Sequence, residues 1–212
     1  MATLGDMKAT IAAEIMRVDL DDAIAREITK AINFYRSQRF WFTEKLNTVA
    51  FDTVDGQSQY LAADNPYIPN LIRIDSMIIT RNGSVTVIEP ISELSMKRLI
   101  GGANPLADTP SYYSYYGQSL TVYPIPNGIY PIVIAGVVRV DAPADNTEED
   151  NPWMNEAEEL IRSRVKRNLF LHWMEDGEAA QRMQAAESEA LDQLRYETSS
   201  RTQVSEFMAT EF

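Results

Sequence analysis

The chain has 212 residues, of which 45% are hydrophobic, and it contains no cysteine. A chain of this length fits one domain, or one body with an inserted subdomain, and the lack of cysteine excludes disulfides and thiol chemistry. The formal net charge of −12 opposes a surface built to grip nucleic-acid phosphates, which needs clustered lysine and arginine. We expect no signal peptide and no membrane-spanning segment, because the sequence lacks the apolar runs that both require.

The first part of the chain has the hydrophobic period of helices. Thr3, with Asp6 three residues later, predicts the start of a helix. Asp19 or Asp21 is expected to cap a second helix. The second helix leads into residues 39–42, an aromatic stretch that we expect to plug the end of a helical bundle; an exposed binding patch is the alternative. The apolar stripe of the second helix comprises Ile24, Ile28, Ala31, Ile32 and Tyr35.

From Asn47 onward the pattern changes to the alternation that is typical of strands. Asn82-Gly83 lies between two strand-like runs and predicts a two-residue hairpin turn, because both positions favour positive φ. We expect residues 111–140 to form a three-stranded meander with turns at Gly117-Gln118 and Asn127-Gly128. The last of these strands is rich in β-branched residues, which fits a largely buried position.

Helical periodicity returns at Asn151-Pro152, where Asn can cap a helix and Pro can occupy its first position. This is expected to be a single long helix, which Asp176-Gly177 ends or sharply bends. A further helix over residues 178–196 has an apolar stripe that is rich in alanine. Because alanine buries little area, we expect this helix to pack closely or to rely on a partner.

These changes of period predict an α+β fold. Residues 1–46 and 151–196 are expected to form one helical bundle. Residues 47–150 are expected to form an inserted antiparallel β subdomain, and residues 197–212, which lack a clean period, a C-terminal extension. The sequence shows no internal repeat that would argue for another architecture.

The sequence offers no recognisable active site, so we expect a protein that is not an enzyme and that holds no cofactor or metal. His172 is the only histidine, and without cysteine a metal site would need it together with several carboxylates. No nucleophile elbow and no phosphate-binding loop occurs. An enzyme with two carboxylates that are distant in the sequence is an alternative, because an acidic chain offers many such pairs.

Two clusters admit both a structural and a functional interpretation. Arg162, Arg164 and Arg167 either pair with carboxylates of the same chain or form a charged patch at a subunit interface, and the interface is our hypothesis. The tyrosines between Tyr112 and Tyr116 either pack in the core or stack on a sugar or a base. The second interpretation gives an alternative function, a β-rich ligand- or carbohydrate-binding module of a virion or bacterial protein.

The order of these elements resembles the head-to-tail adaptor proteins of tailed bacteriophages over nearly the whole chain. The resemblance rests on two N-terminal helices, a small β subdomain and a closing helix that begins near Pro152. The landmarks within the β subdomain are Gly56-Gln57 with Tyr60-Leu61, Asn82-Gly83, Pro110 with Tyr113, Gly117 with Leu120, and Pro124-Ile125-Pro126 before Tyr130.

The resemblance implies a structural virion protein, made in the host cytoplasm and located at the head–tail junction. It implies a homo-oligomeric ring, typically of twelve subunits, that binds the portal protein and, through the β subdomain, a downstream tail or nozzle protein. Genome DNA would pass through the lumen without specific binding, which suits an acidic wall. The C-terminal extension would bind the portal, and its apolar residues are Val204, Phe207, Met208 and Phe212.

Overall fold

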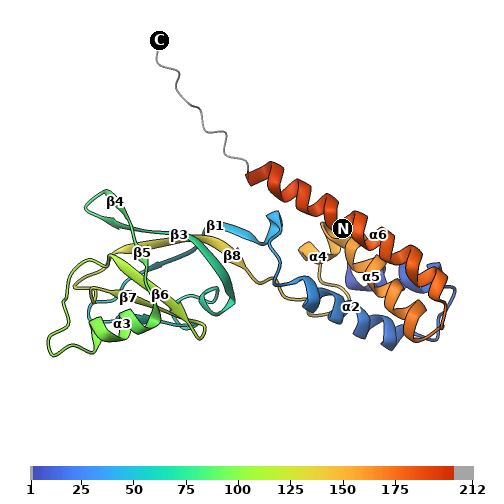
Figure 1. The fold of residues 1–212 in the computed structure, drawn as a ribbon, viewed down its shortest axis with the longest axis horizontal. Helices are drawn as coiled ribbons and strands as arrows, with labels where there is room; N and C mark the ends of the chain where they lie inside the picture. The colour runs from blue at the N-terminus through green and yellow to red at the C-terminus, as the bar shows by residue number, and fades with distance from the viewer. Residues whose placement is uncertain (1, 203–212) are drawn as a thin grey trace, which may run out of the picture. The chain divides into compact units, whose positions relative to one another are not determined.

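The computed structural model describes residues 2–202, and it confirms the α+β fold class (Figure 1). The chain divides into two compact units. The helical unit comprises Met1–Phe42 together with the chain from Val140 onward, and the β unit comprises Thr43–Arg139. The β unit is therefore an insertion between the N-terminal and C-terminal helices. No helix among residues 2–202 combines the length and the apolar character that crossing a membrane requires.

The helical unit begins with two helices whose start positions differ in how well the sequence marks them. At the first helix, the Thr3 hydroxyl accepts from the Asp6 N–H at 3.1 Å, and the Asp6 carboxylate accepts from the Thr3 N–H at 3.0 Å. This capping box confirms the predicted start. At the second helix, Leu20 takes the capping position and no side chain bonds there, so neither aspartate caps it. The helices of this unit in the described residues are α1 (Leu4–Glu14), α2 (Asp21–Tyr35), α4 (Pro152–Asn155), α5 (Glu158–His172) and α6 (Gly177–Thr202).

The aromatic stretch after α2 packs into the helical unit, as the sequence predicted. Phe40 and Phe42 stack on one another with ring centroids 5.3 Å apart, and both meet the edge of Trp153. Trp153 and Phe40 are fully buried, and Phe42 is 6% exposed. The predicted stripe of α2 is also buried. These residues therefore belong to the core of the helical unit and do not form an exposed binding patch themselves.

The prediction of a single long helix after Asn151 is wrong, because two helices, α4 and α5, form instead. The Asn151 side chain accepts from the Trp153 N–H at 3.1 Å and starts α4, but α4 ends at Asn155. Ala157, with φ −116° and ψ 19°, then takes the capping position of α5. Neither glycine nor proline occurs at this break, so the sequence carries no signal for it.

The last helix is longer than the sequence predicted. Residues 197–202 were assigned to a C-terminal extension, but they continue α6 as regular helix. The Thr198 hydroxyl accepts from the Trp41 backbone N–H at 3.1 Å, and the Arg201 guanidinium lies 3.9 Å from the Trp41 ring centroid. These polar contacts fix the final turns on the helical unit, and a search for apolar periodicity does not detect them.

The connector after the β unit packs on the helical unit, although the sequence pattern assigned residues up to 150 to the β subdomain. The Trp153 Nε1–H donates to the Val140 carbonyl at 3.0 Å. The Gly5 N–H donates to the Asn146 carbonyl, also at 3.0 Å. Because these bonds use backbone carbonyls of the connector, its acidic sequence gives no sign of them.

The β unit contains two four-stranded sheets that share one hydrophobic core. The strand order is β1-β8-β3-β4 in one sheet and β2-β7-β6-β5 in the other. All pairs are antiparallel except β5 with β6, so the second sheet is mixed and not purely antiparallel as expected. The elements are β1 (Glu44–Asp52), β2 (Gln59–Tyr60), β3 (Leu71–Arg81), β4 (Ser84–Val87), β5 (Glu89–Pro90), α3 (Glu93–Ile100), β6 (Tyr112–Tyr116), β7 (Ser119–Tyr123) and β8 (Pro131–Val138), with single 3₁₀ turns at Trp41–Thr43 and Ile68–Asn70.

The predicted hairpin turns are confirmed at two places and wrong at a third. Asn82-Gly83 and Gly117-Gln118 adopt positive φ at both positions, as a two-residue turn requires. The three-stranded meander does not form, because β8 pairs with β1 and β3 in the other sheet. Asn127-Gly128 lies in the segment that crosses between the sheets. A central position between two strands explains why β8 is apolar almost throughout.

The close approach of β3 to β8 gives a test of the β unit. A Cβ added to Gly136 would lie 2.3 Å from the Arg73 carbonyl oxygen, which is rigid backbone. We expect Gly136→Ala to destabilise the β unit by about 3 kcal/mol in chemical denaturation, since overpacking against a backbone atom cannot relax. Gly177→Ala is the matched control, because a Cβ there meets nothing within 4 Å. Equal stability of the two variants would contradict this register.

Candidate functional site

The arginines that the sequence assigned to a subunit interface meet carboxylates of their own chain. Arg162 lies 3.5 Å from both Glu14 and Glu158 and also pairs with Glu159. Arg164 and Arg167 both pair with one carboxylate on α6, described below. The structure thus contains the intrachain pairing that was the alternative, and a contact of these arginines with another subunit stays a prediction.

Glu187 is the centre of a buried polar cluster that joins α2, α5 and α6. Its side chain is 7% exposed, and its two oxygens lie 2.7 Å from Arg164 Nη1 and 2.5 Å from Arg167 Nη1. The Tyr35 hydroxyl donates to the same carboxylate. Sequence reasoning missed Glu187, because a carboxylate beside an alanine stripe is normally solvated. The available signal was the pair of arginines three residues apart, which α5 presents on one face.

A second buried carboxylate extends this cluster along α2. Glu27 is 6% exposed and accepts from Lys30 Nζ at 2.6 Å and from Asn168 Nδ2 at 2.9 Å. Burial acts to raise the pKa of Glu27, but the hydrogen bonds from Lys30 and Asn168 outweigh it and hold that pKa below its ordinary value. Arg167 also donates to the Asn168 amide oxygen at 3.3 Å, so the two carboxylates belong to one network.

The tyrosine of the cluster has a strongly shifted pKa. Burial, together with the hydrogen bond to the Glu187 carboxylate, raises the pKa of Tyr35 to about 12. The phenol therefore stays neutral at every physiological pH, and its O–H donates a hydrogen bond to the Glu187 carboxylate. The cluster has a structural role, which we call the lock: its polar atoms bond to one another and hold α2, α5 and α6 together.

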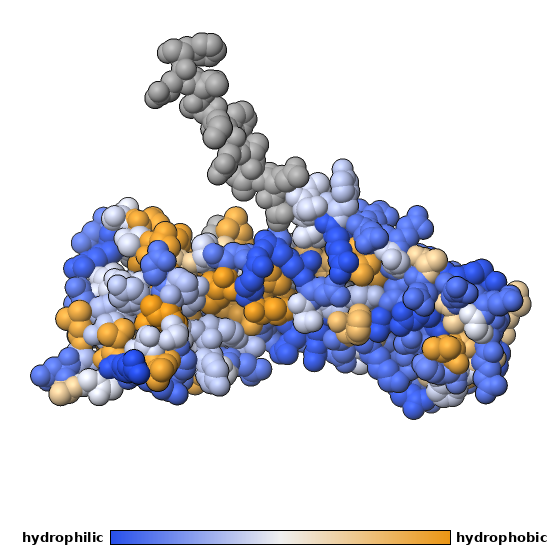
Figure 2. Space-filling view, viewed as in Figure 1, coloured by the Kyte–Doolittle hydropathy of each residue, from blue (hydrophilic) through white to orange (hydrophobic). Residues whose placement is uncertain are grey.

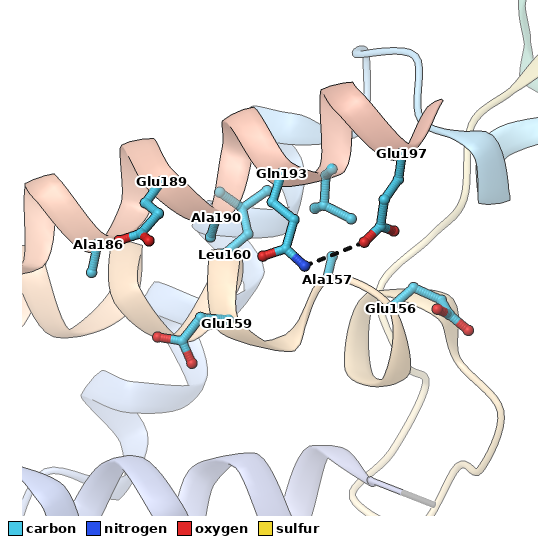
Figure 3. A pocket seen from close by; sticks show the side chains of 10 residues that line it. Glu156, Ala157, Glu159, Leu160, Ala186, Glu189, Ala190, Gln193 and Glu197 are labelled. Carbon is cyan, nitrogen blue, oxygen red and sulfur yellow. Dashed lines mark hydrogen bonds between the residues drawn. The ribbon is translucent and has the colours of Figure 1, made fainter. Parts of the chain in front are cut away.

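One flank of α6 carries an acidic, apolar groove that opens between α5 and α6 (Figure 3). Its volume is about 280 Å³. Four glutamates surround it, two from α6 and two from the α4–α5 segment. No lysine or arginine is among the described residues that line it, although Glu159 pairs with Arg162 outside the lining, and the Gln193 amide donates to Glu197 at 3.3 Å. The apolar lining consists of Ala157, Leu160, Ala186, Ala190 and Leu194, and the glutamates are Glu156, Glu159, Glu189 and Glu197.

The other flank of α6 carries an aromatic and cationic surface. Phe34 is 54% exposed, and the Arg164 guanidinium lies 3.5 Å from its ring centroid. Arg167, Ser188 and Leu191 line the same shallow hollow. At 100° per residue, positions 186, 190, 193 and 197 lie roughly opposite positions 184, 188, 191 and 195 on the helix. The groove and the Phe34 surface therefore occupy opposite flanks of α6.

The tyrosine run of β6 serves mainly the core of the β unit. Tyr113 is 8% exposed, and the Tyr115 hydroxyl donates to the Ile68 carbonyl at 2.8 Å. Burial raises the pKa of both phenols. Only Tyr112 and Tyr116 of this strand are exposed. The packing interpretation accounts for Tyr113 and Tyr115, whereas Tyr116 lies exposed at the edge of a shallow pocket beside α3.

The surface of the β unit also presents apolar side chains (Figure 2). All four residues of β4 are exposed, and this strand is an edge of its sheet. Val85 and Val87 are 60% and 55% exposed. An edge strand with unpaired backbone groups and apolar side chains is suited to pairing with another chain.

The histidine and the C-terminal apolar residues considered in the sequence analysis do not form a site among the described residues. His172 is exposed near the end of α5. Among residues 2–202, no cluster of histidine, aspartate and glutamate is arranged to hold a metal ion. Val204, Phe207, Met208 and Phe212, predicted to bind the portal, lie outside the described residues.

The described residues thus combine buried polar clusters between helices with surface grooves and an open sheet edge, and the latter two are suited to contacts with other proteins. The SU10 adaptor protein family model matches residues 2–209, nearly the whole chain. The chain therefore belongs to this bacteriophage head-to-tail adaptor family, and it is a structural component of the virion. Membership implies that the protein joins other phage head and tail components, which is a structural role. A search of curated proteins finds no match.

Removal of the charge on Glu187 is expected to destabilise the helical unit, because it leaves its cationic partners buried without a counter-ion. Glu187→Gln would leave two guanidinium groups close together without their carboxylate. We expect a loss of about 3 kcal/mol in the free energy of unfolding, measured by urea denaturation. Glu189→Gln is the matched control on the same helix, because Glu189 is exposed and no ion pair to it is present in the described chain; its effect should stay within about 0.5 kcal/mol. Equal losses in both variants would contradict the lock.

The Tyr35 phenol predicts a stability that depends on pH in the alkaline range. Below pH 10 the phenol is neutral in both states, and the wild type should exceed Tyr35→Phe by about 1 kcal/mol. Above pH 10 the unfolded chain loses the proton first, whereas the folded chain keeps it until about pH 12. The advantage of the wild type should therefore shrink as pH rises from 10 to 12. Denaturation curves of the two proteins at several pH values test this, and parallel profiles would contradict it.

Proposed function

We propose that copies of this chain form a closed ring at the head–tail junction, which joins the portal protein to a downstream tail or nozzle protein. The observation that carries the proposal is the family match over residues 2–209. The architecture supports it, because the chain divides into two compact units, each of which can supply its own set of contacts. Twelve is the subunit number that the resemblance suggests.

The two units would serve different partners. The helical unit would pack beside its copies and against the portal. The β unit would face the next tail component, with β4 as a candidate contact because its edge is open and Val85 and Val87 are exposed. A protein that links two different assemblies needs two such separate surfaces.

The charge of the chain fits a channel for DNA. A net charge of −12 on each copy makes a ring strongly acidic. Repulsion from the phosphate backbone lowers affinity, so the genome would pass through the lumen without specific binding.

The interface hypothesis for the three arginines takes a more specific form on this structure. Arg164 and Arg167 would act indirectly, since their guanidinium groups hold Glu187 and support the exposed Phe34 ring. Arg162 would act by neutralising Glu158 and Glu159 at the start of α5. Reversing Arg164 or Arg167 to glutamate would place a second carboxylate beside Glu187, so the folded helical unit would be lost before assembly is tested.

Residues 203–212 supply a test of attachment to the portal. A chain that ends at Thr202 keeps every contact described for α6, including the Thr198 bond to the Trp41 backbone. We expect its melting temperature to match that of the full chain within about 1 °C. We expect the truncated chain, supplied to a phage whose own copy is deleted, to yield filled heads without tails. The apolar anchors repeated around the ring would add up through avidity, and the truncation removes all of them.

The control for this truncation is a full-length chain in which Val204, Phe207, Met208 and Phe212 are all changed to serine. It should fail in the same way, which would assign the loss to the apolar side chains and not to chain length. Infectious particles at normal yield from the truncated chain would show that the extension is not the anchor.

A further inference from the structure

We propose that Phe34 of one copy inserts into the groove between α5 and α6 of the neighbouring copy. The inference rests on the proposed ring and names the contact that closes it. It names the side chain that fills the groove, and it explains why Phe34 is 54% exposed in a single copy.

The groove selects for an apolar side chain accompanied by positive charge. Its lining is alanine and leucine, and about 280 Å³ is enough room for one aromatic ring. Glu159 is already paired with Arg162, whereas no ion pair to Glu156, Glu189 or Glu197 is present in the described chain. An apolar anchor that brings cations would bury its ring and reduce the repulsion among these carboxylates at the same time.

The Phe34 surface has these properties. The ring is covered on one side by the Arg164 guanidinium at 3.5 Å, so it is held in place before docking. Lys30, one helical turn before Phe34, has a side chain that is 68% exposed. Arg195, on the same flank of α6, has a side chain that is 58% exposed. Each cation already lies near a carboxylate of its own chain, Lys30 at 2.6 Å from Glu27 and Arg195 at 4.0 Å from Asp192, and each is exposed enough to contact a neighbouring acidic groove as well.

The placement of the two surfaces gives a contact that repeats. Because they lie on opposite flanks of α6, a copy that offers its Phe34 surface to one neighbour leaves its groove free for the next. Such a heterologous contact generates a ring when the rotation closes. A contact between identical surfaces would stop at a dimer.

The C-terminal extension of the same chain is a poor occupant of the groove. Residues 203–212 bring two carboxylates, Glu206 and Glu211, and no lysine or arginine. Placing them among four glutamates would add repulsion, whereas the Phe34 surface removes it. The charge therefore favours a second copy over the extension.

Disulfide trapping tests the contact directly, because the natural chain has no cysteine. Phage particles are prepared with the full chain carrying Phe34→Cys and Ala190→Cys, oxidised, denatured and run on a non-reducing gel. We expect a ladder of cross-linked multimers, at least tenfold more abundant than with either single substitution. Phe34, on α2, borders one flank of α6 and Ala190 lies on the other, and a disulfide needs Cα atoms within about 7 Å, so we expect the bonds to join different copies.

The matched control pairs Ala190→Cys with Val18→Cys, since Val18 is 89% exposed but belongs to the loop after α1. This control should give no ladder. Particles that contain the chain at its normal amount but yield no Phe34–Ala190 ladder would overturn the inference and leave the proposed ring intact. Absence of the chain from wild-type particles, measured by mass spectrometry, would instead overturn the proposed function.

A second measurement applies if the cysteine variants do not enter particles. Wild-type particles built from a mixture of ¹⁴N- and ¹⁵N-labelled copies are treated with a carbodiimide, which joins amines to carboxylates. Mixed-label links from Lys30 to Glu189 or Glu197 would support the contact. Links of Lys30 confined to single-label pairs, or groove links to a different protein, would overturn it.

Discussion

The position of α6 depends on one buried carboxylate. The apolar stripe of this helix is mostly alanine, which buries little area, so hydrophobic packing alone specifies its register weakly. Glu187 meets two guanidinium groups from α5 and the Tyr35 hydroxyl from α2, and a shift of α6 by one residue would break all of these bonds. Buried ion pairs often add little net stability but penalise every arrangement that separates them. The cluster therefore fixes the register of α6 more than it strengthens the unit.

The register of α6 in turn determines what its surface presents. With Glu187 facing inward, positions 186, 190 and 193 form the acidic groove on one flank, and positions 184, 188 and 191 border the Phe34 surface on the other. Arg164 contributes to both features, because it neutralises Glu187 and covers Phe34. The buried Glu187 cluster and the proposed subunit contact thus share the Arg164 side chain. The arginines would stabilise the fold of each copy and would support the contact between copies only indirectly.

Much of the fold was predictable because it follows from local chemistry. The Thr3 capping box, the buried stripe of α2 and the Asn82-Gly83 turn all depend on residues close in sequence. The pairing of β8 with β1 and β3 was not predictable, because an apolar strand fits any central position and its neighbours are chosen by the whole sheet. Glu187 was missed for a related reason: its burial depends on two arginines that are 20 and 23 residues away. The family match identifies the class of protein from the sequence. The contacts between copies depend instead on surfaces that exist only once the helices are folded.

The central claim is that this chain joins head and tail as a ring of identical copies. The most direct measurement is a cryo-EM reconstruction of the neck of the phage particle, computed without imposed symmetry. The account predicts a closed ring of this chain between portal and tail, with α6 of each copy flanked by the helical unit of the next and the genome channel at the centre. Density showing isolated copies, or copies placed away from the portal, would contradict it.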